Sequence, residues 1–108
     1  MSVIKWKNYY SRWFIFKILK EFLVEPDDFN VCKIDYAESS IEEIISESSS
    51  LPLGYEKKAV VVDNAVFLTK DAKDIEKTEI LDLVNTKTND IAVIFILRSY
   101  YKFSLIFA

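Results

Sequence analysis

A three-layer α/β fold, in which a mostly parallel sheet is flanked by helices, is the architecture that this sequence predicts. Two apolar runs, "KAVVVD" at 58–63 and "IAVIFIL" at 91–97, show no polar alternation, which is typical of parallel strands buried on both faces. Segments with helical periodicity precede and separate these runs. Because parallel neighbours need a long crossover connection, the alternation predicts βαβ units in a doubly wound sheet.

Length and composition limit the chain to one domain. It has 108 residues, of which 51% are hydrophobic, so we expect a single domain over residues 1–108 with one hydrophobic core. Cys32 is the only cysteine and histidine is absent. These counts exclude an intrachain disulfide, a zinc site built from cysteine and histidine, and a catalytic triad that uses histidine.

The apolar runs are also too short to cross a membrane. None approaches the length of about 20 residues that a spanning helix needs, and the first residues do not form a signal peptide. We therefore expect a cytoplasmic protein with no membrane partner.

Charge is distributed unevenly along the chain. Nine acidic residues stand against the single Lys33 between residues 25 and 56, and we interpret this stretch as a solvated face rather than an acidic binding surface. No basic stripe is present, so DNA is expected to be contacted only indirectly.

The first half of the chain predicts a helix, a strand and a second helix. An amphipathic helix is expected over roughly residues 10–24, with a buried stripe at helical spacing formed by Ile15, Ile18, Leu19 and Phe22. Pro26 and the acidic pair after it end that helix, and "FNVCKIDY" follows as a short strand. In "SSIEEIISESSS", Ser39 or Ser40 is the expected N-cap, paired with Glu42 or Glu43 in a capping box, and the buried stripe is Ile41, Ile44 and Ile45.

The second half continues the alternation. Strand 58–63 is followed by a helix inside "FLTKDAKDIEKTEILDLVNTKTND", for which we expect an apolar face of Ile80, Leu81 and Val84, and then by strand 91–97. The tail "RSYYKFSLIFA" alternates in polarity like one more strand, although little room is left before it for a helical crossover.

A nucleotide-binding corner is the first functional hypothesis for "LPLGYEKKAVVVDNA". A phosphate loop needs several glycines after a strand, whereas Gly54 is the only glycine and precedes one. Asp63 has the position of a magnesium-holding acid at a strand end. However, Asn64 stands where an active ATPase of the AAA+ class commonly has a catalytic glutamate. The pattern therefore argues against ATP hydrolysis.

An alternative function uses the same strand-end acids. A magnesium-dependent phosphotransferase or nuclease would hold its metal with Asp63 and either Asp35 or Asp90. We rank this alternative second because the chain lacks a phosphate loop.

A family resemblance rests on an ordered series of segments. These are "ILKEFL", "DDFNVCKIDYAESSIEEIISESSSLPLGYEKKAVVVDNAVFLTK" and "NDIAVIFIL". Over about residues 17–97 the chain resembles the N-terminal domain of the bacterial DNA polymerase III delta subunit, the clamp-loader component that opens the ring-shaped sliding clamp. The resemblance implies a role in DNA replication and a RecA/AAA+-like fold that has lost its phosphate loop and its ATP hydrolysis. It implies no cofactor, no metal and no intrinsic catalytic site, although the family is a component of the polymerase holoenzyme.

The resemblance also implies a clamp-binding site. In the family, the region before the buried strand inserts apolar side chains into a hydrophobic pocket on the clamp, and here that region is "LPLGYEKK". Leu53 matches the apolar anchor, Gly54 stands where the family often has a bulky aromatic residue, and Tyr55 is the expected substitute. The implied partners are the sliding clamp and the other clamp loader subunits.

Both ends of the chain depart from the family. "MSVIKWKNYYSRWFIF" does not show the family's first strand or the remnant of its phosphate loop, and the chain stops after "RSYYKFSLIFA", before the family's lid and collar regions. A truncated or frame-altered gene product, which would be a nonfunctional fragment, is therefore the third hypothesis.

Overall fold

The structure, a computed structural model, describes residues 6–7, 11–68, 74–98 and 103–107 and contains one five-stranded sheet. The strand order is β1-β5-β4-β3-β2. The strands are β1 (Trp6–Lys7), β2 (Val31–Asp35), β3 (Lys58–Asp63), β4 (Ile91–Arg98) and β5 (Phe103–Phe107). The helices are α1 (Ser11–Leu23), α2 (Ile41–Glu47) and α3 (Asp74–Thr86), and short 3₁₀ turns cover Tyr36–Glu38 and Val66–Leu68.

The parallel part of the sheet is formed by β2, β3 and β4. β3 pairs in parallel with both neighbours, and α2 and α3 make the two crossovers. β5 is antiparallel to β4, and β1 is antiparallel to β5. Only four residues separate β4 from β5, too few for the helical crossover that a parallel pair requires. The tail is therefore a strand, as its alternation predicts, and it runs antiparallel.

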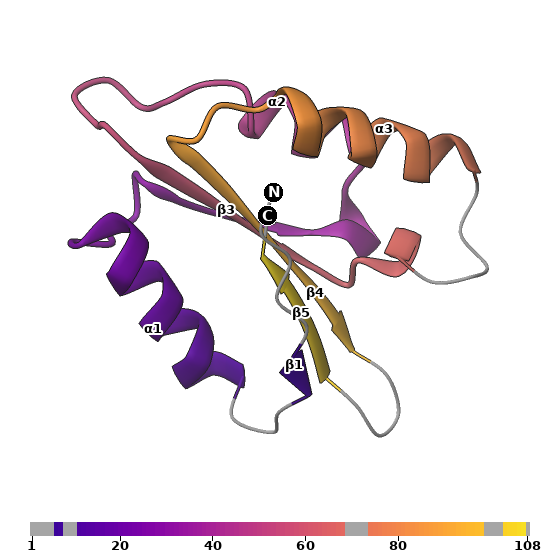
Figure 1. The fold of residues 1–108 in the computed structure, drawn as a ribbon, viewed down its shortest axis with the longest axis horizontal. Coiled ribbons are helices and arrows are strands. Elements are labelled where there is room, and N and C mark those ends of the chain that lie inside the picture. Colours follow the sequence, from indigo (N-terminus) through magenta and orange to yellow (C-terminus); the bar gives the residue numbers. More distant parts are fainter. Residues whose placement is uncertain (1–5, 8–10, 69–73, 99–102, 108) are drawn as a thin grey trace.

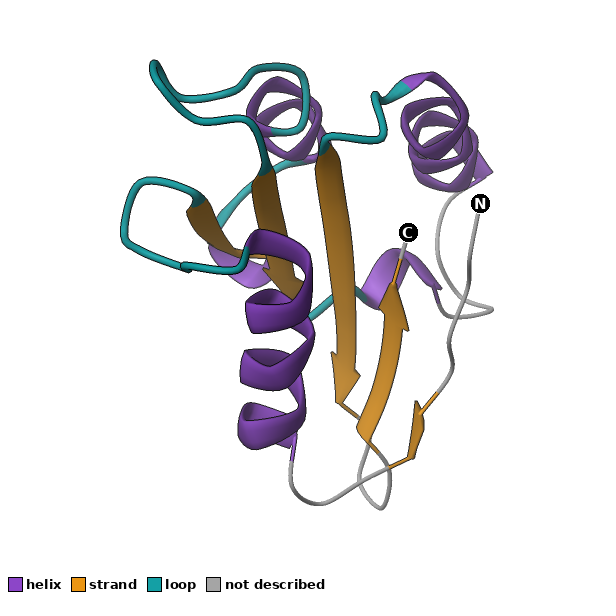
Figure 2. Ribbon diagram, turned by 60° about the vertical axis from the view of Figure 1, so that its left-hand side comes forward, coloured by secondary structure: helices purple, strands orange, loops and turns teal. Residues whose placement is uncertain are grey.

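Helices cover both faces of the sheet. Figure 1 shows α2 and α3 on one side and α1 on the other, and Figure 2 shows α1 lying along the strands. The side chains of β3 alternate accordingly: Val60 and Val62 pack with the α2 and α3 residues, whereas Ala59 and Val61 pack with Leu19 and Leu23 of α1. The predicted three-layer α/β fold is confirmed.

Local sequence signals account for the helix boundaries. Ser40 is the N-cap of α2, and its hydroxyl accepts a hydrogen bond from the Glu43 backbone N–H at 3.3 Å. The Ser39 hydroxyl donates to the Glu43 carboxylate, so both predicted serines take part in the capping. In α1 the predicted stripe packs on the sheet, while Lys17, Lys20 and Glu21 are exposed. No helix in the described part of the chain is long and apolar enough to cross a membrane.

One part of the predicted α3 face is wrong. Leu81 is 56% exposed, and Leu83 is buried in its place beside Ile80, with Val84 packed at the edge of the cluster. Residues 80, 83 and 84 follow the i, i+3, i+4 spacing of a single helix face, whereas residue 81 turns about 100° away from residue 80.

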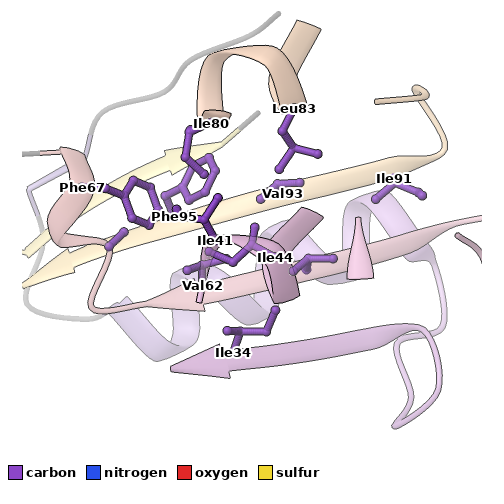
Figure 3. Packing of buried hydrophobic residues seen from close by; sticks show 12 residues of the cluster. Ile34, Ile41, Ile44, Val62, Phe67, Ile80, Leu83, Ile91, Val93 and Phe95 are labelled. Atoms are coloured by element: carbon purple, nitrogen blue, oxygen red, sulfur yellow. The ribbon is translucent and has the colours of Figure 1, made fainter. Parts of the chain in front are cut away.

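Phe67 is the central aromatic side chain of the core on the α2 and α3 side. It is 1% exposed, and its ring packs edge-to-face against Tyr36 at 4.9 Å and Phe95 at 5.5 Å between ring centroids. Figure 3 shows Phe67 beside Phe95, with Ile80 and Leu83 descending from α3. The Phe67 ring, from the turn after β3, thus contacts one ring from the turn after β2 and one from β4.

Phe67→Ala should lower the free energy of unfolding by about 3–5 kcal/mol, because it leaves a cavity and removes both ring contacts. Phe67→Leu keeps most of the apolar volume and should lower it by only about 1–2 kcal/mol. Urea unfolding followed by circular dichroism measures both values, with exposed Leu81→Ala as a control expected within about 0.5 kcal/mol of wild type. An alanine variant as stable as wild type would contradict this account of the core.

Candidate functional site

Two loops meet at the amino end of the parallel strands. The first, residues 24–30, connects α1 to β2, and the second, residues 48–57, connects α2 to β3. Because β2 and β3 are paired neighbours, the two loops extend from the same end of the sheet, as both Figure 1 and Figure 2 show. Residues 24–30 and 51–57 together are called the amino-end surface below.

The first loop is held by its own polar side chains. The Asp27 carboxylate accepts hydrogen bonds from the backbone N–H groups of Phe29 at 2.7 Å and Asn30 at 3.0 Å. Buried Asn30 accepts from the Asp27 N–H at 2.7 Å and donates to the Glu25 carbonyl at 3.0 Å. These bonds fix the backbone, so the loop displays the 72% exposed Phe29 without needing its ring for packing.

The second loop contains a tight turn that displays Leu53. The Tyr55 N–H donates to the Pro52 carbonyl at 3.1 Å, which places Leu53 and Gly54 at the two corners. Gly54 has a φ of +86°, the value that the third residue of a type II turn requires and that glycine adopts without strain. Leu53, at the other corner, is fully exposed (101%).

A hydrogen bond joins the two loops. The Tyr55 hydroxyl donates to Asp27 Oδ2 at 2.7 Å, across 28 residues of sequence, and the Tyr55 ring lies 6.4 Å from the Phe29 ring between centroids. The bond from Tyr55, followed by backbone N–H bonds from Asn30 and Phe29, lowers the pKa of Asp27, and the same bond raises the pKa of Tyr55. Half-buried Tyr55 therefore fixes the position of one loop against the other.

A buried lysine anchors the base of the second loop. Lys58 is 5% exposed, and its ammonium donates to the Glu47 carboxylate at 3.0 Å, the Glu47 carbonyl at 2.5 Å and the Ser50 carbonyl at 3.3 Å. The end of α2 is thus tied to the start of β3.

The neighbouring Cys32 is half-buried in β2. Burial, followed by the charge of Glu47, raises the pKa of its thiol.

The residues predicted for clamp binding are together on this surface, in different environments. Leu53 and Gly54 are exposed at the turn, whereas Tyr55 is half-buried and bonded to Asp27. The sequence analysis did not predict that Phe29 and Asp27 lie on the same surface, in contact with Tyr55. The available signal was an aromatic residue inside a polar turn, "PDDFN", where no helix or strand periodicity accounts for it.

The strand-end acids of the alternative function lie at other places. Asp35 and Asp63 are register partners at the carboxyl ends of β2 and β3 and line an open groove of about 690 Å³ together with Phe16 of α1. Asp90 precedes β4 at the opposite, amino end of the sheet, where its carbonyl accepts from the Lys58 N–H at 3.0 Å. The structure therefore brings Asp63 together with Asp35 but not with Asp90.

Asn64 bridges the two adjacent acids. Its side chain donates to Asp35 Oδ1 at 2.7 Å, its backbone N–H donates to Asp63 Oδ1 at 2.8 Å, and its own φ is +56°. The bond from Asn64, followed by one from the Ala37 N–H, lowers the pKa of Asp35. Among the described residues no group of three or more acidic, cysteine or histidine side chains is placed to hold a metal ion.

The fold and the amino-end surface define an α/β domain that presents two joined loops to solvent. The sequence matches the model of the family described as DNA polymerase III, delta subunit, over residues 15–102, and the chain belongs to this family. Comparison with curated proteins and with solved structures gives no match. Family membership supports a clamp-loader-type role in DNA replication and membership of the clamp loader of the polymerase III complex.

Tyr55→Phe should raise the pKa of Asp27 toward its ordinary value, because the variant lacks the hydroxyl that donates to the carboxylate. A group with a lowered pKa in the folded state stabilises the fold above its unfolded-state pKa of about 3.9, and this contribution is lost as pH falls through the folded-state value. The stability difference between wild type and variant should thus exist at pH 7 and narrow below about pH 4. Carboxyl-carbon NMR titration and urea unfolding measure the two effects, and an unchanged Asp27 titration would contradict the contact between the loops.

Asn64→Gly and Asn64→Ala separate the side chain of Asn64 from its backbone. Both variants remove the donor to Asp35 and should raise the pKa of that carboxyl. Alanine at a φ of +56° is strained, so Asn64→Ala should be less stable than Asn64→Gly by about 1 kcal/mol. Equal stability of the two variants would argue against the left-handed conformation.

Proposed function

We propose that this protein is a delta-type clamp loader subunit that binds the sliding clamp and helps to open it, without hydrolysing ATP itself. The observation that carries the proposal is the full exposure of Leu53 at the corner of a fixed turn, within a chain that belongs to the delta subunit family. Leu53 is the apolar anchor, Gly54 gives the turn its shape, and Tyr55 holds the loop in place.

The physical basis of binding is the removal of apolar surface from water. An exposed leucine stabilises a complex when a pocket on the partner encloses it, by about 25 cal/mol for each Å² of apolar surface buried. Because the turn is already fixed by its hydrogen bond and by the Tyr55–Asp27 contact, little conformational entropy is lost on binding. Higher affinity for the open ring than for the closed ring is sufficient to favour opening.

The proposed absence of ATP hydrolysis rests on sequence and on Asn64. The chain has a single glycine, located before β3 rather than after a strand, so no glycine-rich phosphate loop is available among its residues. Asn64 follows the strand-end acid and uses its side chain to bond Asp35. The remaining proposed features are one domain over residues 1–108, no cofactor, association with other loader subunits, and contact with DNA only through these partners.

Leu53→Ala should weaken binding of the full chain to the cognate sliding clamp by about 30-fold, the effect of a central apolar anchor. Titration calorimetry measures the dissociation constant. Leu81→Ala, which truncates a 56% exposed leucine on α3, away from the amino-end surface, is the control and should leave binding unchanged. Wild-type protein that does not bind the clamp, or a Leu53→Ala effect no larger than that of the control, would refute the proposed function.

A further inference from the structure

The geometry points to Phe29 as a second anchor of the same surface, one that fits an apolar pocket surrounded by basic residues on the clamp. This inference rests on the proposed function and adds to it a residue from another segment of the chain and the charge of the partner site. It follows from three observations: the exposure of Phe29, its place beside Tyr55, and the carboxylates around it.

Phe29 is mostly exposed although its ring contacts Tyr55. The residue is 72% exposed, and hydrogen bonds between Asp27 and Asn30, and from Asn30 to Glu25, fix its loop. Aromatic side chains are enriched at binding hot spots, and this one is presented on a loop whose backbone is already fixed. The ring is therefore available to a partner at low entropic cost.

Phe29 lies against the second loop through its contact with Tyr55. Its ring lies 6.4 Å from that of Tyr55, two residues after Leu53 in the second loop. Position 54 has no side chain, and the Tyr55 hydroxyl is occupied by Asp27. Phe29 is therefore the more exposed of the two aromatic side chains where the loops meet.

The charge around these apolar residues is negative, and the inference assigns a binding role to acidic residues that the sequence predicts only as a solvated face. Four exposed carboxylates, those of Glu25, Asp27, Asp28 and Glu56, outnumber the exposed Lys57 ammonium, which lies 5.1 Å from the centroid of the Phe22 ring. An apolar centre with an acidic rim is complementary to an apolar pocket with a basic rim, and such complementarity acts mainly on the association rate. Association with the clamp should therefore slow as salt concentration rises.

The first test is titration of the full chain with the cognate clamp. Phe29→Ala should weaken binding about tenfold or more. Phe16→Ala, which truncates a 55% exposed phenylalanine on α1 beside the carboxyl-end groove, is the matched control and should bind like wild type. Both variants should keep the wild-type unfolding midpoint, because both rings are mostly exposed.

The second test is the charge of the rim. Asp28→Lys should lower the association rate constant about threefold or more and reduce its dependence on salt, as measured by surface plasmon resonance. Asp82→Lys on α3 makes the same change in net charge away from the amino-end surface and should have a smaller effect. Equal effects of the two variants would overturn the basic-rim part of the inference.

The outcomes separate the two proposals. If wild type binds and Leu53→Ala weakens binding while Phe29→Ala matches Phe16→Ala, the role of Phe29 is overturned and the proposed function stands. If wild type does not bind the clamp, both are overturned. Weakening by Leu53→Ala and by Phe29→Ala, each beyond its control, supports both.

Discussion

The burial of β3 on both faces is the constraint on which the other elements depend. Residues 58–62 are all buried, and their side chains alternate between the α1 layer and the layer formed by α2 and α3. A strand of this kind is stable only when each face is covered, so the chain must place helices on both sides of the sheet. β3 also pairs with β2 and β4, and its parallel pairing with β2 brings loops 24–30 and 48–57 to one end of the sheet.

Lys58 shows how the buried strand controls the exposed surface. A buried ammonium is unfavourable unless it is paired, and here a carboxylate and two carbonyl groups at the end of α2 accept its hydrogen bonds. A cation is also favourable at a helix C-terminus, where unpaired carbonyl groups gather. Loop 48–57 therefore begins and ends at fixed points, and the turn that displays Leu53 lies between them.

The sequence was sufficient for features that depend on local pattern. The apolar runs of β3 and β4 predicted buried parallel strands, and the serines before Ile41 predicted the start of α2, because burial and capping follow from neighbouring residues. The predicted buried face of α3 was partly wrong, because "ILDLV" has leucines on two adjacent faces of the helix. Only packing on the sheet selects Leu83 over Leu81 for burial. The contact of Asp27 and Phe29 with Tyr55 could not be predicted, since it depends on the pairing of β2 with β3.

Gly54 restricts which residues the turn before β3 can carry. A side chain at this position would meet no atom within 4 Å, so space does not prevent an aromatic residue from occupying it. The backbone conformation disfavours such a residue, because a φ of +86° is unfavourable for an L-residue by about 1–2 kcal/mol. A substitution that places a bulky residue at position 54 is therefore best tolerated when the path of the loop changes with it. A neighbouring position can therefore supply an aromatic side chain to this surface more readily than residue 54 itself.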